Sequence, residues 1–316
     1  MPDRHLDSFD YKKLFSDREK RLQIINRLAF IPTIPYLKIV YRIKTGRKLN
    51  LVRPTLFAEK LNWLKVNDIH PEYTNYVDKA YMKKYIAERF GERFVIPCYG
   101  TWSSFSDIDF EILPNQFVLK CTHDSGSAKV IKDKRTMDLP SLKRFFDQRL
   151  KISSYSLGRE YPYRDVPRKI LAEEYHESLD GSYITDLKIM CFNGKVIAFY
   201  FISGKGKNGN ELITWFDAQC NRLDIIDRTG EGTDETCVIP STIHEMFQMA
   251  EELSKGIPFV RVDFLVDRDQ FYFAEMTFYN NGGFVLLEPE KWEYYFASFI
   301  DCNKLLEEKK LSGFEG

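Results

Sequence analysis

The chain has 316 residues, of which 44% are hydrophobic and 29% are charged, and its 46 acidic residues balance its 46 basic ones. This length predicts two or three lobes, and the composition is that of a globular protein with enough apolar material for a core, which excludes a disordered chain. The balanced charge argues against a protein devoted to nucleic acid.

Cysteine spacing and hydropathy indicate the compartment. The six cysteines show no C-x-x-C spacing, so we expect reduced thiols rather than a disulfide framework or a zinc site. No apolar run reaches the roughly 18 residues that span a bilayer, and no signal peptide opens the chain. These features predict a cytoplasmic protein.

Residues 1–52 are expected to form a basic helical extension. Between residues 12 and 53 there are twelve Lys or Arg and only two acids. Apolar residues recur at helical spacing over 21–31 and 36–44, with prolines between the two stretches. One interpretation is a helical extension packed on the main body with a solvated basic face. The other is peripheral contact of residues 12–53 with an anionic membrane surface or a partner.

The remainder of the chain mixes strands and helices. Periodicity and turn signals predict helices over residues 57–66, 78–90, 139–150 and 246–253, and strands over 94–99, 117–122, 129–132, 169–175, 186–192 and 195–201. Short turns such as Asn193-Gly194 join several strands directly, which indicates an α+β architecture rather than a strictly alternating one. The stretch 151–168, rich in Tyr, Ser and Arg, is expected to be irregular and exposed.

Two short segments near the end of the chain, residues 261–264 and 273–278, alternate apolar and polar residues like half-buried strands. If the loop between them holds three or five residues, Asp263 faces Glu275 across the hairpin. Two facing carboxylates repel unless a cation lies between them, and Mg²⁺ bound to nucleotide phosphates is the common case. The alternative is two carboxylates on a solvated sheet face.

Other polar motifs are ordinary when taken singly. They are Lys120 at a strand end, the small-residue loop Ser125-Gly126-Ser127, the strand end Glu173-Glu174-Tyr175, and the pair Asp186-x-Lys188. The loop has one glycine and does not match a Walker phosphate-binding loop, although its backbone N–H groups and hydroxyls suit a phosphate. His123, in the same loop, is expected to face solvent, and the alternative is contact with a phosphate or the acceptor.

The order of these motifs carries a resemblance to a known family. The residues that carry it are Glu59-Lys60-Leu61-x-Trp63-Leu64, Asp78-Lys79, Leu113-Pro114-x-x-Phe117-Val118-Leu119-Lys120, Cys191-Phe192-Asn193-Gly194, Arg261-Val262-Asp263-Phe264 and Glu275-x-Thr277-Phe278-Tyr279. The chain resembles the ATP-grasp superfamily and, more closely, the TupA-like (teichuronopeptide-biosynthesis) ATP-grasp family of polysaccharide-biosynthesis proteins, over residues 48 to 300.

The resemblance implies an ATP-grasp fold, in which two α+β lobes sandwich ATP. It divides the chain into an N-terminal ATP-grasp subdomain over residues 53–116, a lid subdomain over 117–176 and a C-terminal subdomain with the metal site over 177–316. The basic extension, residues 1–52, lies outside the resemblance.

The resemblance also implies a nucleotide site. Lys120 and Lys188 would contact the phosphates of ATP, and the loop of Ser125, Gly126 and Ser127 would cover them. The hinge residues would bind adenine, and a nearby acid would bind the ribose. These residues are Glu173, Glu174 and Tyr175 for the base and Glu177 for the sugar.

The metal and catalytic roles follow in the same way from the resemblance. Asp263 and Glu275 would hold Mg²⁺, while Arg261 and Lys188 would act on the transferred phosphoryl group. Many ATP-grasp enzymes carry an asparagine as a third metal ligand two residues after the glutamate. Here that place is Thr277. A second departure is Asn280-Asn281-Gly282-Gly283, which leaves the acceptor side open.

The implied activity is an ATP-dependent carboxylate–amine ligase that works through an acyl phosphate. By the same resemblance, one partner would be an amino acid or similar small molecule and the other a carboxylate-bearing or amino-bearing sugar of a capsule, exopolysaccharide or O-antigen. Two alternatives remain open. One is a metal-dependent glycosyltransferase, for which Asp107-x-Asp109 and Asp267-x-Asp269 offer D-x-D triplets. The other is a non-catalytic nucleotide-binding scaffold at the membrane.

Overall fold

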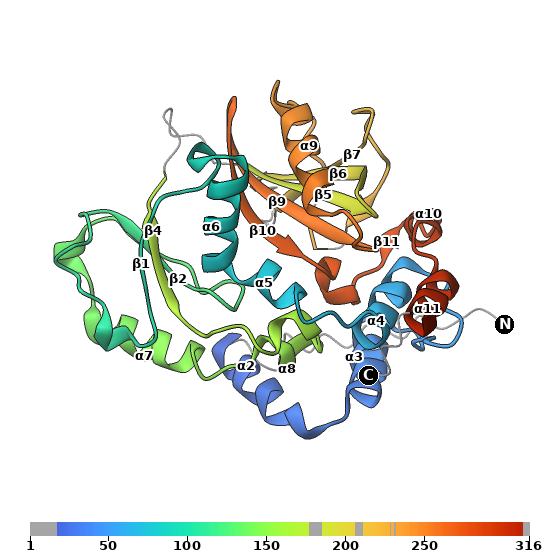
Figure 1. Cartoon of the computed structure of the whole chain (residues 1–316), viewed down its shortest axis with the longest axis horizontal. Helices are drawn as coiled ribbons and strands as arrows, with labels where there is room; N and C mark the ends of the chain where they lie inside the picture. Colours follow the sequence, from blue (N-terminus) through green and yellow to red (C-terminus); the bar gives the residue numbers. More distant parts are fainter. Residues whose placement is uncertain (1–17, 177–184, 206–210, 228, 231, 312–316) are drawn as a thin grey trace.

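The computed structural model describes residues 18–176, 185–205, 211–227, 229–230 and 232–311 of the chain. Within these residues, three antiparallel sheets are present, with strand orders β10-β9-β5-β6-β7, β1-β4-β2-β3 and β11-β8 (Figure 1). Helices cover or separate the two larger sheets, so the expected α+β class is confirmed. None of the described helices combines the length and apolar character that crossing a membrane requires.

The larger sheet places the charged residues of the site on one of its faces. Its strands are β5 (Thr185–Phe192), β6 (Lys195–Lys205), β7 (Glu211–Asp217), β9 (Val260–Asp267) and β10 (Gln270–Thr277). The sequence analysis did not anticipate β7, whose apolar run lacks strict alternation. Helix α9 (Ile243–Leu253) covers the apolar face, where the ring of Phe247 contacts that of Phe199. Because side chains alternate along a strand, Tyr200 and its cross-strand partner Lys188 lie on the opposite face.

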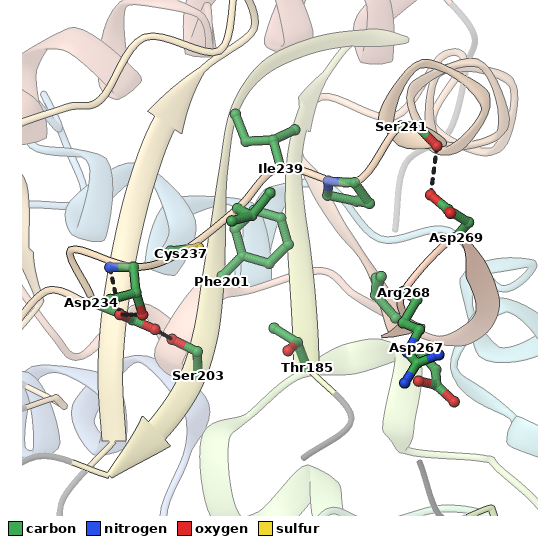
Figure 2. A pocket seen from close by; sticks show the side chains of 14 residues that line it. Thr185, Phe201, Ser203, Asp234, Cys237, Ile239, Ser241, Asp267, Arg268 and Asp269 are labelled. Carbon is green, nitrogen blue, oxygen red and sulfur yellow. Dashed lines mark hydrogen bonds between the residues drawn. The ribbon is translucent and has the colours of Figure 1, made fainter. Parts of the chain in front are cut away.

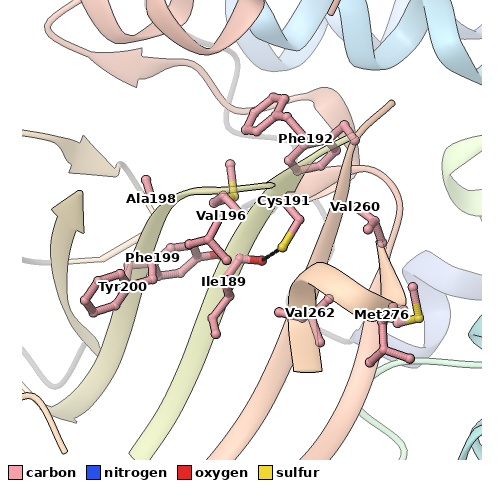
Figure 3. Packing of buried hydrophobic residues seen from close by; sticks show 14 of the residues in the cluster. Ile189, Cys191, Phe192, Val196, Ala198, Phe199, Tyr200, Val260, Val262 and Met276 are labelled. Atoms are coloured by element: carbon pink, nitrogen blue, oxygen red, sulfur yellow. Dashed lines mark hydrogen bonds between the residues drawn. The ribbon is translucent and has the colours of Figure 1, made fainter. Parts of the chain in front are cut away.

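The apolar face is dense with branched and aromatic side chains. Ile189, Val262 and Phe199 are fully buried there (Figure 3). Aromatic packing continues at the end of β5, where Phe192 contacts Phe57 and Phe296 at ring-centroid distances of 5.9 and 6.0 Å. This rigid core holds the polar face of the sheet in position.

The hairpin of β9 and β10 brings Asp263 opposite Glu275, but not by the expected loop length. The turn holds only two residues, Arg268 and Asp269, so the ladder begins with Gln270 opposite Asp267. That register alone would place Ala274 opposite Asp263. A β-bulge between Phe273 and Glu275 moves Glu275 into this position. The expected three- or five-residue loop was therefore wrong, while the predicted pairing is confirmed.

The smaller sheet combines β1 (Cys98–Trp102), β2 (Phe117–Cys121), β3 (Lys129–Ile131) and β4 (Ile170–Glu174). Its core includes Phe117, Leu119 and Ile170, and Phe146 of helix α7 (Leu139–Arg149) packs against it. The strand expected over 94–99 begins only at Cys98, because residues 92–94 form a short 3-10 helix and Pro97 follows. The third sheet pairs β8 (Ile226–Asp227) with β11 (Leu287–Glu288).

Two consecutive helices lie next to the sheets in space. These are α5 (Tyr73–Val77) and α6 (Lys79–Phe90), and α6 lies between the smaller sheet and the hairpin of β9 and β10 (Figure 1). Asp78 begins α6 as its N-cap, because its carboxylate accepts the N–H of Ala80 at 2.9 Å. This cap fixes the first turn of α6, and hence Lys79, next to both sheets.

The described part of the N-terminal extension is helical, with α2 (Arg18–Arg27) and α3 (Thr33–Thr45). It packs on the stretch 151–168, which the sequence analysis expected to be irregular and exposed. That expectation was wrong, since the stretch contains α8 (Ser154–Gly158) and the buried Arg159. The guanidinium of Arg159 donates to the carbonyls of Leu28 and Ile31 at 2.9 and 3.1 Å, which offsets the cost of burying its charge.

Two residues of the motifs that carry the resemblance, Glu59 and Lys60, serve the fold rather than the site. At the start of α4 (Phe57–Asn67), the buried carboxylate of Glu59 accepts the backbone N–H groups of Asn50, Thr55 and Leu56 at 2.9–3.2 Å. The Lys60 ammonium donates to the carbonyls at the end of α10 (Lys291–Ser298) and just beyond it, before α11 (Cys302–Leu311) begins. Both side chains therefore lock α4 between neighbouring segments.

Glu59→Ala is expected to lower the free energy of unfolding by roughly 2–3 kcal/mol, because three backbone N–H groups lose a charged acceptor in a buried place. Urea denaturation monitored by circular dichroism measures this. The matched control is Glu88→Ala on α6, whose side chain is 68% exposed, and which should change stability by less than about 0.5 kcal/mol. Equal effects of the two substitutions would contradict the assigned role of Glu59.

Candidate active site

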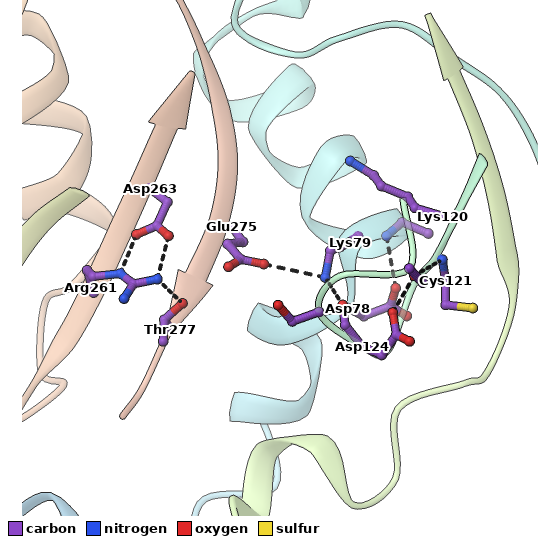
Figure 4. Close-up of polar contacts among 12 residues, drawn as sticks. Asp78, Lys79, Lys120, Cys121, Asp124, Arg261, Asp263, Glu275 and Thr277 are labelled. Carbon is purple, nitrogen blue, oxygen red and sulfur yellow. Dashed lines mark hydrogen bonds and ion pairs between the residues drawn. The ribbon is translucent and has the colours of Figure 1, made fainter. Parts of the chain in front are cut away.

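The centre of the site is a buried carboxylate held by two cations on the polar face of the larger sheet. Asp263 is 2% exposed. Arg261 donates two hydrogen bonds to it, Nε to Oδ1 at 2.7 Å and Nη2 to Oδ2 at 2.6 Å (Figure 4). Lys188 Nζ also donates to Oδ2, at 3.0 Å. Burial alone would raise the pKa of Asp263, but the two cations hold it below its usual value. Asp263 is therefore an anion.

The second carboxylate, Glu275, stands opposite Asp263 on β10 and is more accessible. Its side chain is 29% exposed, and its Oε2 lies 3.4 Å from Lys79 Nζ at the start of α6. Lys79 Nζ also donates to the carbonyl of Asp124, in the loop after β2, at 2.7 Å. Lys79 therefore links Glu275 of the larger sheet with the loop after β2 of the smaller sheet (Figure 4).

On the smaller sheet, Glu173 lies between two lysines. Its Oε1 is 2.5 Å from Lys120 Nζ and its Oε2 is 2.9 Å from Lys83 Nζ of α6. Burial lowers the pKa of Lys120, and the charge of Glu173 opposes that shift. Burial likewise works to raise the pKa of Glu173, but the two lysines hold it below its usual value. The structure thus places Lys120, Lys83 and Glu173 in one charged cluster.

The loop after β2 is divided between an exposed tip and a buried anchor. Ser125 and Gly126 are exposed, and Gly126 has φ +73°, which favours glycine. Ser127 is buried. Its Oγ donates to Asp124 Oδ1 at 2.5 Å and accepts the N–H of Cys121 at 2.8 Å. Only the tip of the predicted phosphate loop therefore presents its groups outward.

His123 is buried as well, with 2% of its surface exposed, so the expectation that it faces solvent was wrong. Burial lowers its pKa, which favours the neutral imidazole. The loop folds inward at this point because Asp124 Oδ2 pairs with the buried Arg149 of α7 at 2.9 Å.

The other predicted hinge residues end β4. Glu174 is half-buried and its N–H donates to the carbonyl of Pro97 at 2.9 Å. Tyr175 is half-buried, with Lys132 Nζ at 5.6 Å from its ring centroid. Glu177 lies outside the described residues, so its role at a ribose stays a prediction.

The third predicted metal residue, Thr277, takes part in the same polar network. Its Oγ1 accepts from Arg261 Nη2 at 3.2 Å. Arg261 Nη1 donates to the buried Asn280 at 2.8 Å and to the hydroxyl of Tyr200 at 3.2 Å. Asn280 and Tyr200 thus orient the arginine, and sequence reasoning had assigned neither of them. The signal for Tyr200 was its strand position opposite Lys188.

The donor set suits Mg²⁺. Asp263 and Glu275 carry hard carboxylate oxygens on facing positions, and those of Asp263 also accept from Arg261 and Lys188. The hydroxyl of Thr277 contacts Arg261 beside them. Among the described residues, no group of three or more His, Cys, Asp and Glu side chains could form a metal cage. Mg²⁺ in nucleotide sites needs no such cage, since one or two carboxylates and the substrate's phosphates hold it.

A tight turn borders this network on the side away from the smaller sheet. Asn281, Gly282 and Gly283 all have positive φ. From α4, Asn62 donates to the carbonyl of Gly283 and Lys65 to that of Gly282, both at 2.6 Å. A Cβ on Gly283 would lie 2.8 Å from Asn62 Nδ2, so this position requires glycine. The sequence motif at 280–283 is therefore a structural brace beside Arg261.

Lys65 gives this brace a pH dependence. Burial lowers the pKa of Lys65 to about 7, far below the roughly 10.4 of an exposed lysine. Between these values the unfolded chain binds more protons, so the free energy of unfolding should rise with pH from 7 to 9.5, by about 2–3 kcal/mol. Lys65→Met should lack this rise in urea denaturation, while the control Lys84→Met, exposed on α6, should keep it. A wild-type curve that is flat over this range would contradict the assignment.

A separate pocket lies away from this network. It has a volume of about 610 Å³ and opens beside the turn of β9 and β10 (Figure 2). Both acids of the triplet Asp267-x-Asp269 line it, and each has a polar partner. Asp269 Oδ1 accepts from Ser241 Oγ at 2.6 Å, and Asp267 Oδ2 lies 3.5 Å from His176 Nε2. The triplet is thus part of the turn that shapes the hairpin.

Two antiparallel sheets with facing carboxylates and lysines gathered between them have the architecture of the ATP-grasp proteins. The sequence profile of the TupA-like ATP-grasp family matches residues 59–299. The chain belongs to this family, and the resemblance drawn from its motifs is confirmed. A comparison with curated proteins gave no match.

Solved structures with similar folds include D-alanine–D-alanine ligase from Bacillus anthracis, with a TM-score of 0.46 and 17% identity over 75% of this chain and 69% of that one. The ATP-grasp ligase PsnB, complexed with a phosphomimetic variant of its minimal precursor, Mg and ADP, gives a TM-score of 0.43 and 10% identity over 95% and 73%. D-cycloserine synthetase DcsG gives 0.36 and 15% over 71% and 69%.

Proposed function

We propose that this protein is an ATP-dependent ligase that joins a carboxylate to an amine through an acyl phosphate. The observation that carries the proposal is the facing pair Asp263 and Glu275, with Arg261, Lys188 and Lys79 within 3.4 Å of their oxygens. Phosphoryl transfer asks mainly for positioning and for neutralisation of phosphate charge, and this cluster supplies both.

In the proposed reaction, a carboxylate oxygen of one substrate attacks the γ-phosphorus of ATP, and the bond from that phosphorus to the β,γ-bridging oxygen breaks. ADP leaves and an acyl phosphate remains. The amine of the second substrate then attacks the acyl carbon, phosphate departs, and the amine nitrogen loses a proton to give the amide. No nucleophile of the protein is required.

The chain's own residues have distinct roles in this scheme. Asp263, Glu275 and the hydroxyl of Thr277 would hold Mg²⁺, whose charge would offset that of the phosphates. Arg261, oriented by Asn280 and Tyr200, would face the transferred phosphoryl group together with Lys188. Lys120 would hold the phosphates of ATP.

The remaining predicted contacts complete the nucleotide site in the same proposal. The tip of the loop, Ser125 and Gly126, would cover the phosphates, with Ser127 as its anchor. The end of β4, from Glu173 to Tyr175, would line the adenine. In this arrangement residues 117–176 act as the lid and residues 53–116 and 177–316 as the two subdomains beneath it.

For the substrates, family membership favours an amino acid or similar small molecule and a carboxylate-bearing or amino-bearing sugar of a bacterial surface polysaccharide. Such a reaction would take place in the cytoplasm, where ATP and Mg²⁺ are available. The D-x-D alternative of a glycosyltransferase has less support, because the chain belongs to the TupA-like ATP-grasp family.

An ADP-release screen tests the proposal. Mg²⁺–ATP is supplied with panels of amino acids and of glycans that contain uronic acids or amino sugars. The expected result is ADP release that requires one member of each panel. Thermal protection by sugar nucleotides and none by Mg²⁺–ATP would instead identify a glycosyltransferase. ATP binding without release of ADP under any substrate pair would identify a scaffold.

A further inference from the structure

The outer face of α3 carries apolar side chains that no other element within the described residues covers. Ile39 and Ile43 are 53% and 39% exposed. The opposite face of the helix is well packed, since Tyr36, Leu37 and Tyr41 are buried. Exposed isoleucines at positions i and i+4 form a stripe along the helix rather than scattered surface residues.

Basic side chains flank this stripe. Lys38 and Arg42 are exposed beside Ile39 and Ile43, and Lys48 follows the helix. Between residues 20 and 53 there are nine Lys or Arg and no acid, although the whole chain is neutral. Positive charge is thus concentrated in this segment of the chain, where Arg47 pairs with Glu290.

The two kinds of side chain meet around one hollow of about 560 Å³. Its lining residues, which we call the α3 face, are Lys38, Ile39, Arg42, Ile43, Lys48 and Leu49. Basic groups at the rim and apolar groups within are the pattern of a surface that lies on anionic lipid headgroups. The basic side chains would also suit the phosphates of a nucleic acid, but the exposed isoleucines between them would not.

The α3 face also lies away from the candidate active site. In Figure 1, α2 and α3 follow the lower edge of the molecule, while the hairpin of β9 and β10 lies in its upper half. Contact through α3 would therefore leave the site open to small molecules.

We propose that the α3 face docks the protein on an anionic lipid surface. Ile39 and Ile43 enter the headgroup region, and Lys38, Arg42 and Lys48 contact lipid phosphates. The helix lies along the surface and does not cross it. This inference does not depend on the ligase reaction, and its test needs no substrate.

Flotation of the full chain with vesicles tests the proposal. We expect binding to phosphatidylcholine vesicles that contain about a third phosphatidylglycerol, and little to phosphatidylcholine alone. The double variant Lys38→Glu, Arg42→Glu should lower the vesicle partition coefficient at least about 25-fold, because each Lys or Arg near such a surface contributes about fivefold. The double variant Ile39→Asp, Ile43→Asp should also lose binding to the vesicles, although it keeps every Lys and Arg.

A charge-matched control, Lys84→Glu with Lys255→Glu, reverses two lysines whose side chains are 77% and 70% exposed on α6 and just after α9. It should float like the wild type. Equal binding by this control and by the Lys38, Arg42 variant would overturn the proposal, as would binding that ignores phosphatidylglycerol. Sedimentation velocity without vesicles adds a further outcome. A dimer that the Ile39, Ile43 variant converts to monomer would assign the α3 face to a second copy of the chain and overturn the lipid proposal.

Discussion

Replacing Glu275 by glutamine is expected to reduce substrate-dependent ADP release by about 100- to 1000-fold or more, while leaving the fold intact. The amide keeps the size of the side chain but removes the charge that, with Asp263, would hold Mg²⁺. The side chain is 29% exposed and its nearest cation, Lys79, retains the carbonyl of Asp124. The free energy of unfolding should therefore change by less than about 1 kcal/mol.

The measurement is a coupled ADP assay beside urea denaturation of the same sample. Glu245→Gln is the matched control, because its carboxylate forms an ion pair with Arg93 at 2.7 Å on the outside of α9. That variant should keep wild-type turnover. A Glu275→Gln enzyme that works at the wild-type rate would remove the metal site from the proposal, whatever the effect on stability.

Asp263→Asn is expected to damage both activity and stability. The carboxylate is fully enclosed and accepts from Arg261 and Lys188 at 2.6–3.0 Å. Removing one partner of a buried ion pair leaves the others uncompensated, so the free energy of unfolding should fall by about 3 kcal/mol. ADP release should be lost as well, because a metal ligand disappears and Arg261 loses the group that orients it.

The two substitutions therefore separate on a stability measurement, although both abolish turnover. Asp267→Asn provides the control for position, since it makes the same change on the same strand and outside the charged network. It should retain ADP release. If Asp263→Asn were as stable as Glu275→Gln, the cluster of Arg261, Lys188 and Asp263 would not be the buried network described above.

Much of the larger sheet was predictable because its hairpin obeys a simple periodicity. The alternation around Asp263 and Glu275 gave the faces of the two strands and their outer ends to within one residue, while each strand extends three residues farther toward the turn than predicted. The bulge at Ala274 was not predictable, since nothing in the local sequence distinguishes an extra residue from an ordinary strand position. The extra residue of the bulge shifts the register by one, as a loop of three residues would have done. The pairing of Asp263 with Glu275 was therefore predicted correctly although the predicted loop length was wrong.

Other parts of the site depended on contacts between distant segments. Lys79 was recognised only as part of a motif, and its role appears when α6 lies between the two sheets. Likewise, Arg159 is buried in a stretch without periodicity, because carbonyls from the N-terminal extension receive its guanidinium. Periodicity reports which face of an element is apolar, but it does not report which buried charge will find a distant partner.

The position of Lys79 has a consequence for motion. One ammonium holds both a carboxylate of β10 and a backbone carbonyl after β2, so any separation of the two sheets must break one of these contacts. For a side chain that is 12% exposed, this loss would cost roughly 2 kcal/mol, so a conformer with separated sheets would be about 30-fold rarer than it would be without the contact. The strength of the Lys79 contacts would in this way set how often the space between the two sheets becomes accessible to substrates.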